Sequence, residues 1–292
     1  MVSSWPHDFA MEVALFLEAN RQDNSKIIKV LSDHIDRENV RLLGESGSGI
    51  LKLNGFGEIN FPFYSLGKVK SYFHLEYREL VLFCFYRKLH YRYSRFLDVG
   101  GNLGLHSIVF AKLSHQKISY FEPDPTHFSE AEIRFRANGV HERIEMFNLA
   151  ISDFDGHAGF VRVVDNTTAS HLVGSKSSAY GPLDEFSVKV NRLDSQLAVG
   201  EMTLGKLDIE GSEASALASI SPEKWENFDA IVEVTNHKNA TEIMEMCLRL
   251  QLKIFSQKIS WQSVRSISDM PYNYKEGSII ISKTLSSGEL LS

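Results

Sequence analysis

The sequence is poor in the residues and runs that mark several classes of protein. Its 292 residues include only two cysteines, Cys84 and Cys247, and their spacing fits neither a metal site nor a redox motif. This argues against a disulfide framework and predicts two small buried thiols in a reducing compartment. The longest apolar run, near residues 80–86, is too short to span a bilayer.

An excess of basic residues is also missing. Lys and Arg number 31 against 37 Asp and Glu, which gives a formal net charge of -6. A broad nucleic-acid surface needs a clustered basic face, and the basic run at residues 87–95 is interpreted as the solvated end of a helix. Residues 1–8 lack the basic and apolar segments of a secretory signal. We therefore expect a cytoplasmic protein that binds neither nucleic acid nor membrane.

The pattern of apolar residues divides the chain into two regions. Residues 1–93 are expected to form an N-terminal extension of helices and a β-hairpin. The helices are predicted at residues 11–17, 26–43 and 76–93, and the hairpin strands at 50–54 and 56–64. This extension is expected to cover an acceptor site or to form a subunit contact, such as a homodimer interface.

From residue 94 to 292, predicted strands and helices alternate. The strands lie at residues 95–99, 117–121, 144–151, 206–209, 230–234 and 278–282, and the helices at 105–113, 126–138, 214–220 and 240–252. Such alternation is typical of a mostly parallel sheet covered by helices on both faces. The fold class is therefore predicted to be α/β with a doubly wound sheet.

A glycine-rich turn follows the first strand of this second region, from Asp98 to Gly104 with the sequence DVGGNLG. Glycines permit a tight turn and let a ligand approach the backbone, next to the free N–H groups of a helix N-terminus. The spacing matches neither the dinucleotide motif nor a P-loop. The Asp98 carboxylate would repel a pyrophosphate, but it suits an ammonium group such as the methionine end of S-adenosylmethionine.

An acidic residue ends the second strand of the alternating region, in the dipeptide Glu122-Pro123. It lies about twenty residues after the glycine turn, where an acid accepts hydrogen bonds from both hydroxyls of an adenosine ribose. The turn and this acid, in this order and at this separation, predict a nucleoside ligand.

A charged segment stands where an apolar strand is expected. Lys206, Asp208 and Glu210 alternate with apolar residues, so one face of the predicted strand carries three ionisable groups. Burial of these groups is costly unless they pair with one another or with a ligand. They are predicted to be catalytic, with Glu233 at the same edge of the sheet and His237 as a further candidate base.

The combination of these motifs resembles the FkbM-type methyltransferases, which depend on S-adenosylmethionine. The family pattern is Asp-x-Gly-Ala-Asn-x-Gly, then Glu-Pro, then Leu-Asp, then Lys-x-Asp-x-Glu-Gly-x-Glu. The matching residues are Asp98, Gly100, Asn102, Gly104, Glu122, Pro123, Leu193, Asp194, Lys206, Asp208, Glu210, Gly211 and Glu213. The resemblance covers residues 94–284, and Gly101 in place of the usual alanine is expected to be a mild change.

The resemblance implies a cofactor site and a reaction. S-adenosylmethionine would be held by Asp98, Gly100, Gly101, Asn102, Gly104, Glu122, Pro123 and Ala150. Family members characteristically methylate hydroxyl groups, so the implied activity is O-methylation of a small molecule, a sugar, a glycan or a natural-product intermediate.

Two versions of the chemistry stay open at this point. In the first, Asp208 or Glu210 takes the proton of the hydroxyl while Lys206 holds the carboxylate. In the second, Asp208, Glu210 and Glu233 bind Mg²⁺, and we favour the version without metal. A nicotinamide-dependent oxidoreductase, a nucleic-acid methyltransferase and a binding or assembly protein without turnover are the alternative functions.

Overall fold

Eight strands form the main sheet of the protein, as a computed structural model describes it for residues 5–66, 69–175 and 182–291. Their order across the sheet is β15-β14-β16-β13-β12-β5-β6-β7. The strands are β5 (Arg95–Val99), β6 (Lys117–Phe121), β7 (Ile144–Phe147), β12 (Thr203–Leu207), β13 (Phe228–Glu233), β14 (Lys253–Ser256), β15 (Gln262–Ser263) and β16 (Ser278–Ser282). The five strands from β13 to β7 are parallel, whereas β16 is antiparallel to both of its neighbours.

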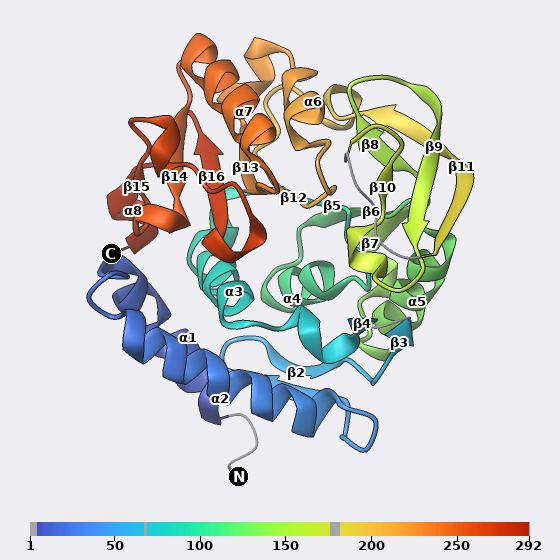
Figure 1. Cartoon of the computed structure of the whole chain (residues 1–292), viewed down its shortest axis with the longest axis vertical. Coiled ribbons are helices and arrows are strands. Elements are labelled where there is room, and N and C mark those ends of the chain that lie inside the picture. Colours follow the sequence, from blue (N-terminus) through green and yellow to red (C-terminus); the bar gives the residue numbers. More distant parts are fainter. Residues whose placement is uncertain (1–4, 67–68, 176–181, 292) are drawn as a thin grey trace.

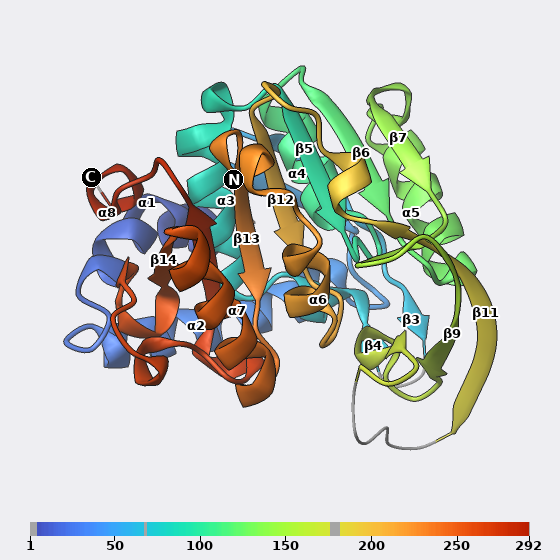
Figure 2. The same ribbon diagram turned by 90° about the horizontal axis from the view of Figure 1, so that it is seen from above.

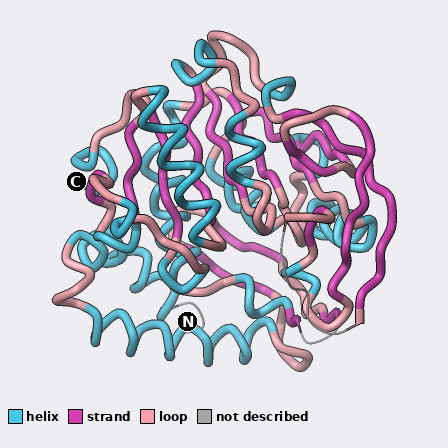
Figure 3. Tube along the Cα trace, turned by 45° about the horizontal axis from the view of Figure 1, so that its top comes forward, coloured by secondary structure: helices cyan, strands magenta, loops and turns pink. Residues whose placement is uncertain are grey.

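Helices cover both faces of this sheet (Figures 1 and 3). They are α1 (Trp5–Ala19), α2 (Ser25–Leu43), α3 (Tyr77–Leu89), α4 (Leu105–Leu113), α5 (Pro125–Ala137), α6 (Glu213–Ala218), α7 (His237–Leu250) and α8 (Ser287–Leu291). Alternate residues of β5 face opposite cores: Phe96 packs with α1 to α5, whereas Leu97 and Val99 pack with α6 and α7. The doubly wound α/β fold predicted from the sequence is confirmed.

The register of the central strands brings three chain segments to one edge of the sheet. Val99 pairs with Leu207 of β12 on one side and with Phe121 of β6 on the other. The residues that follow these strands therefore emerge side by side, at the point where the chain winds away from β5 in opposite directions. Ligands of such sheets bind at this point.

A second, smaller sheet was not predicted. It has the order β10-β9-β11-β8 and consists of β8 (Ala150–Ser152), β9 (Gly156–Val163), β10 (His171–Leu172) and β11 (Leu183–Arg192). Figure 2 shows its long strands β9 and β11 beside the main sheet. The single strand expected at residues 144–151 was wrong, because the chain turns at Asn148 and passes from β7 in one sheet to β8 in the other. The Asn148 side chain stabilises this turn through bonds to the carbonyls of Glu122 (2.8 Å) and Pro123 (3.1 Å).

The N-terminal residues contain the expected kinds of element with different bounds. The hairpin strands are β1 (Ile50–Leu53) and β2 (Gly57–Asn60), followed by the short pair β3 (Ser65–Leu66) and β4 (Val69–Lys70). Asn138 anchors the hairpin to the sheet region, because its side chain bonds both the N–H (2.8 Å) and the C=O (2.7 Å) of Asn60. One hydrophobic core runs from α1 to the main sheet. A division of the chain at residues 93 and 94 stays a prediction.

Two further expectations from the sequence concern membrane-spanning helices and the first eight residues. No helix in the described part of the chain is long and apolar enough to cross a membrane. The stretch of residues 1–8 that was inspected for a secretory signal lies partly outside the described residues, which begin at residue 5.

Candidate functional site

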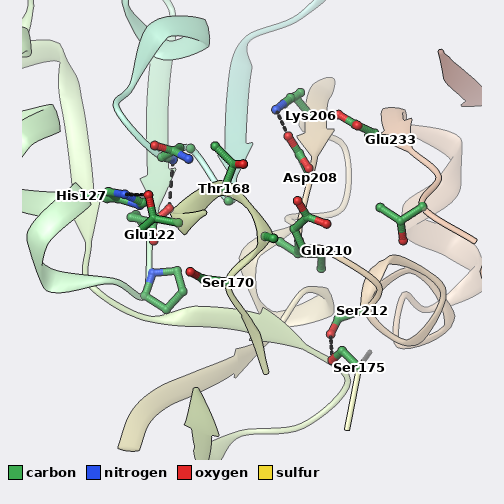
Figure 4. Close-up of a pocket in the computed structure, with 18 of the residues that line it drawn as sticks. Glu122, His127, Thr168, Ser170, Ser175, Lys206, Asp208, Glu210, Ser212 and Glu233 are labelled. Carbon is green, nitrogen blue, oxygen red and sulfur yellow. Dashed lines mark hydrogen bonds and ion pairs between the residues drawn. The ribbon is translucent and has the colours of Figure 1, made fainter. Parts of the chain in front are cut away.

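A cavity of about 1100 Å³ opens at the edge of the sheet where β5, β6, β12 and β13 end. Most of the predicted site residues line it: Gly100, Gly101, Asn102, Glu122, Pro123, Ala150, Lys206, Asp208, Glu210, Glu233 and His237. Figure 4 shows Glu122 on one side of this cavity and the pair of Lys206 and Asp208, with Glu233, on the other. The structure thus brings the predicted nucleoside site and the predicted catalytic acids together.

The glycine turn lies against the loop that follows β12. Gly100 has a φ of 75°, and a Cβ atom added to it would lie 2.0 Å from the carbonyl oxygen of Asp208. The two segments are also joined by a hydrogen bond from the Asp208 N–H to the Val99 carbonyl (3.0 Å). Glycine is required at position 100 because the two backbones approach too closely for any side chain.

Asp98 and Gly104 belong to this turn but do not line the cavity. Asp98 is fully buried, and its Oδ2 accepts bonds from the N–H (3.0 Å) and hydroxyl (2.7 Å) of Ser107. Its Oδ1 has no hydrogen-bond partner within the described structure. Gly104 contacts α5 instead, since an added Cβ would lie 2.4 Å from the Phe135 ring. Their predicted contacts with a cofactor are not tested by this geometry.

Gly101 separates the Asp98 carboxylate from the cavity. A Cβ atom at this position would lie 2.3 Å from the Tyr120 ring and 3.1 Å from Cγ of Asp98. In this chain an alanine at position 101 would overlap the Tyr120 ring, and the effect of glycine there on cofactor contacts stays a prediction. The large ring of Tyr120, whose hydroxyl donates to the Asn102 carbonyl, occupies the space that an alanine methyl would need.

Glu122 is held by the backbone on both sides of its carboxylate. Its oxygens accept bonds from the N–H groups of Asn102 (2.9 Å) and Asp124 (2.8 Å). Burial raises the pKa of Glu122 to about 8, although these two bonds favour the charged form. Pro123 and Ala150 line the cavity next to this carboxylate. When Glu122 loses its proton, its carboxylate can accept hydrogen bonds from a ligand.

The strand expected at residues 206–209 was wrong at its end. β12 stops at Leu207, so Asp208 and Glu210 lie in the following loop, and the predicted alternation along one strand face does not apply to them. Glu210 has a φ of 56°, a left-handed conformation that is uncommon outside glycine. Beyond Leu207, backbone N–H groups of this loop bond to the carboxylate of Glu213.

Glu213 is fully buried at the start of α6. Its carboxylate accepts bonds from the N–H groups of Ile209 (2.9 Å) and Gly211 (3.0 Å) and from the Asn239 side chain. Glu213 therefore fixes the loop on both sides of Glu210. The loop places Asp208 and Glu210 at the cavity wall.

Lys206 and Asp208 form a partly buried ion pair, with 3.0 Å between Nζ and Oδ2. Burial alone would lower the pKa of Lys206, but Asp208, Glu79, Asp98 and Glu233 outweigh this effect and raise it, so the ammonium stays charged. Burial, and then the charge of Asp208, raise the pKa of Glu233 well above its ordinary value. Burial and the neighbouring acid thus disfavour the charged form of Glu233 beside this pair.

His237 lies at the rim of the cavity. It is the first residue of α7, exposed, and its ring lies 5.4 Å from that of Tyr272 between centroids. It lines the same cavity as Asp208 and Glu210, so its predicted part in the site stays a prediction.

Several polar residues of the cavity were missed by the sequence analysis. Glu79 and His74 come from the N-terminal extension, and His106 comes from the first turn of α4. Nε2 of His127 forms a hydrogen bond of 3.1 Å with the hydroxyl of Thr167, which lies in the segment before β10. Burial lowers the pKa of His74 to about 4, which leaves this ring neutral.

One signal in the sequence could have identified part of this set. His106 interrupts an apolar helix between Leu105 and Ile108, where a buried histidine needs partners. Glu79, in contrast, stands in the first turn of a helix, where an acid is ordinary. Its approach to His106 depends on tertiary packing.

Charged side chains gather around the cavity without forming a metal-binding group. Across residues 5–66, 69–175 and 182–291, no set of three or more His, Cys, Asp or Glu side chains could hold a metal ion. Among the acids of the cavity, Asp208 is paired with the Lys206 ammonium at 3.0 Å.

The comparisons with known proteins agree with this geometry. The model of the methyltransferase FkbM domain matches residues 98–255, which begin at the glycine turn and end in β14. The fold and the site thus define a methyltransferase. Within this class, the chain belongs to the FkbM family. No curated protein matches the sequence.

Solved structures of several methyltransferases are similar to the chain at low sequence identity. The methyltransferase FkbM from Methylobacillus flagellatus is 12% identical over 67% of this chain and 47% of its own, with a TM-score of 0.40. An rRNA methylase from Streptococcus thermophilus is 11% identical over 71% and 97%, with a TM-score of 0.40. The N-terminal domain of human METTL16 in complex with SAH is 10% identical over 64% and 60%, with a TM-score of 0.34. The chain thus spans about half the length of the Methylobacillus protein.

Proposed function

We propose that the protein is an S-adenosylmethionine-dependent O-methyltransferase acting on a hydroxyl of a small molecule, a sugar, a glycan or a natural-product intermediate. The observation that supports this most is the single cavity that joins the glycine turn and Glu122 to the Lys206–Asp208 pair. Its volume of about 1100 Å³ lies just above the usual range for one small ligand. The cavity is large enough to hold a cofactor and an acceptor at the same time.

The residues on the glycine-turn side fit such a cofactor. Glu122 offers a carboxylate for the two ribose hydroxyls, and Gly100 and Gly101 expose backbone toward the methionine portion. The Asp98 carboxylate lies behind Gly101, with Cγ 3.1 Å from where a Cβ atom would stand, and its Oδ1 has no hydrogen-bond partner within the described structure. It is a candidate for the negative charge that an ammonium group needs. When bound, S-adenosylmethionine supplies a methyl group on a positively charged sulfur.

Residues on the opposite side of the cavity are candidates to bind and deprotonate the acceptor. Asp208 is the first candidate to accept the proton of the reacting hydroxyl, and the ion pair with Lys206 supports one orientation of its carboxylate. Glu233, whose pKa burial raises, lies on the same side of the cavity and is a candidate hydrogen-bond partner of the acceptor. Glu210, on the same loop as Asp208, is the second candidate base.

The test is methyl transfer from labelled S-adenosylmethionine to a metabolite and glycan extract, with products identified by mass spectrometry. NAD reduction assays and an RNA acceptor are run in parallel. We expect a labelled methyl ether on a small molecule or glycan. Label on RNA, hydride transfer with NAD, or no product from any extract would contradict the proposed function.

A further inference from the structure

A carboxylate from outside the family match reaches the cavity. Glu79 stands in the first turn of α3, 19 positions before the family match begins at residue 98. Its Oε2 lies 2.8 Å from Nε2 of His106, and 24% of its side chain remains exposed. Glu79 is one of the residues that line the cavity, although its Oε2 atom is buried.

The surroundings fix this carboxylate in place. His106 is held on its other ring nitrogen by the hydroxyl of Tyr86, with 2.8 Å between Nδ1 and the oxygen. Tyr86 is fully buried between Phe83, Phe96 and Phe110. Tyr86 and Glu79 both belong to α3, so His106 is clamped by one rigid element. The carboxylate is therefore preorganised for a ligand.

Glu79 is also charged and close to the catalytic acids. Burial alone would raise the pKa of Glu79, but His106 and then Lys206 outweigh it and lower the pKa to about 2. In turn, Glu79 contributes to the charge that surrounds Lys206 and Glu233. An ionised carboxylate accepts hydrogen bonds but cannot donate them.

Glu79 precedes the apolar run of α3, in a first turn where the helix dipole favours an acid. The residues from Leu80 to Tyr86 are all buried, and only one of the two Glu79 oxygens is engaged by His106. Phe73, which exposes 53% of its surface, lines the same cavity and supplies an apolar wall. A few fixed polar groups within an apolar wall are typical of a ligand site.

We infer that Glu79 is an acceptor-binding residue, whose carboxylate accepts a hydrogen bond from a second hydroxyl of the acceptor while the first hydroxyl reacts at Asp208. The inference rests on the proposed function. It requires an acceptor with two neighbouring hydroxyls and no anionic group next to them, because Glu79 and Asp208 would repel one. The N-terminal extension thus contributes to acceptor recognition as well as to the fold.

The experiment compares wild type with Glu79→Gln on the acceptor identified by the labelled-extract assay. Loss of a hydrogen bond to a charged group predicts a KM higher by roughly 10- to 100-fold. The dissociation constant of S-adenosylmethionine should change little, whereas the unfolding midpoint should fall, because the variant loses the charge that pairs with His106 and Lys206. Glu38→Gln is the matched control, since Glu38 is an ion-paired carboxylate of the extension that does not line the cavity.

A second measurement separates direct contact from a change in structure. Wild type is assayed with the acceptor that lacks the neighbouring hydroxyl, and so is Glu79→Gln. If Glu79 binds that hydroxyl, the two losses will not add, because both remove the same interaction. Additive losses, an unchanged KM in Glu79→Gln, or a product whose methyl lies next to a carboxylate would overturn the inference. No product with the wild type would instead contradict the proposed function.

Discussion

The most specific prediction concerns Glu122 and the dependence of stability on pH. Glu122 has an ordinary pKa of 4.5 when the chain is unfolded, and burial raises it to about 8 in the native state. Between these values the native protein keeps a proton that the unfolded chain has released. The unfolded state then binds fewer protons, so this group makes the free energy of unfolding fall as pH rises from about 4.5 to about 8.

The size of the effect follows from the shift. One pKa unit corresponds to about 1.36 kcal/mol, so Glu122 costs roughly 4 to 5 kcal/mol across this pH window. Glu122→Gln removes the group that titrates. The variant also loses one hydrogen bond, to Asn102 or Asp124, and this loss lowers the free energy of unfolding by the same amount at every pH. The variant should therefore gain stability relative to wild type as pH rises.

The assay is urea unfolding of the protein without added cofactor at pH 5, 6.5 and 8. Glu142→Gln is the control, because the Glu142 side chain is 93% exposed. We expect the difference between Glu122→Gln and wild type to change steadily with pH, and the control to follow wild type. Parallel curves for Glu122→Gln and wild type would refute the reasoning that burial holds a proton on this carboxyl.

Four further outcomes are expected. Affinity of the wild type for S-adenosylmethionine, measured by calorimetry, should rise by up to about tenfold per pH unit below pH 8, since ionised Glu122 accepts the ribose hydroxyls; a flat profile would count against this role. Asp208→Asn should bind the cofactor like wild type in a thermal-shift assay but lose methyl transfer, and normal turnover would make Asp208 structural. Glu213→Ala should lower the free energy of unfolding by about 3 kcal/mol in urea titrations, because three donors lose their acceptor, whereas a loss below 1 kcal/mol would show that the loop holds without it. Gly101→Ala should cost about 1–3 kcal/mol in the same assay through overlap with Tyr120, and an unchanged midpoint would mean that the ring moves freely.

The sheet and the nucleoside side of the cavity could be predicted because both depend on local sequence. The glycine turn between Val99 and Leu105 and the acid at Glu122 each follow directly from the end of a strand. Parallel strands place their carboxyl ends at one edge, so these residues had to meet once the strand order was known. The prediction needed no knowledge of distant contacts.

The acceptor side could be predicted only in part. The charged segment identified Lys206 and Asp208, but the pattern of alternation extended the strand past Leu207, where Glu213 takes over the backbone bonds. Glu79 reaches the cavity through the packing of α3 on α4, which no local pattern records. The second sheet was missed for a similar reason, since its strands pair with each other after a change of direction at Asn148.

The central claim is that the pocket beside β5 binds a sulfonium nucleoside with a positively charged amino-acid end. Isothermal titration of the wild type at pH 8 with S-adenosylmethionine, and separately with NAD, tests this directly. We predict saturable binding of one S-adenosylmethionine per chain and no heat with NAD. Tight binding of NAD, with none of S-adenosylmethionine, would contradict the account.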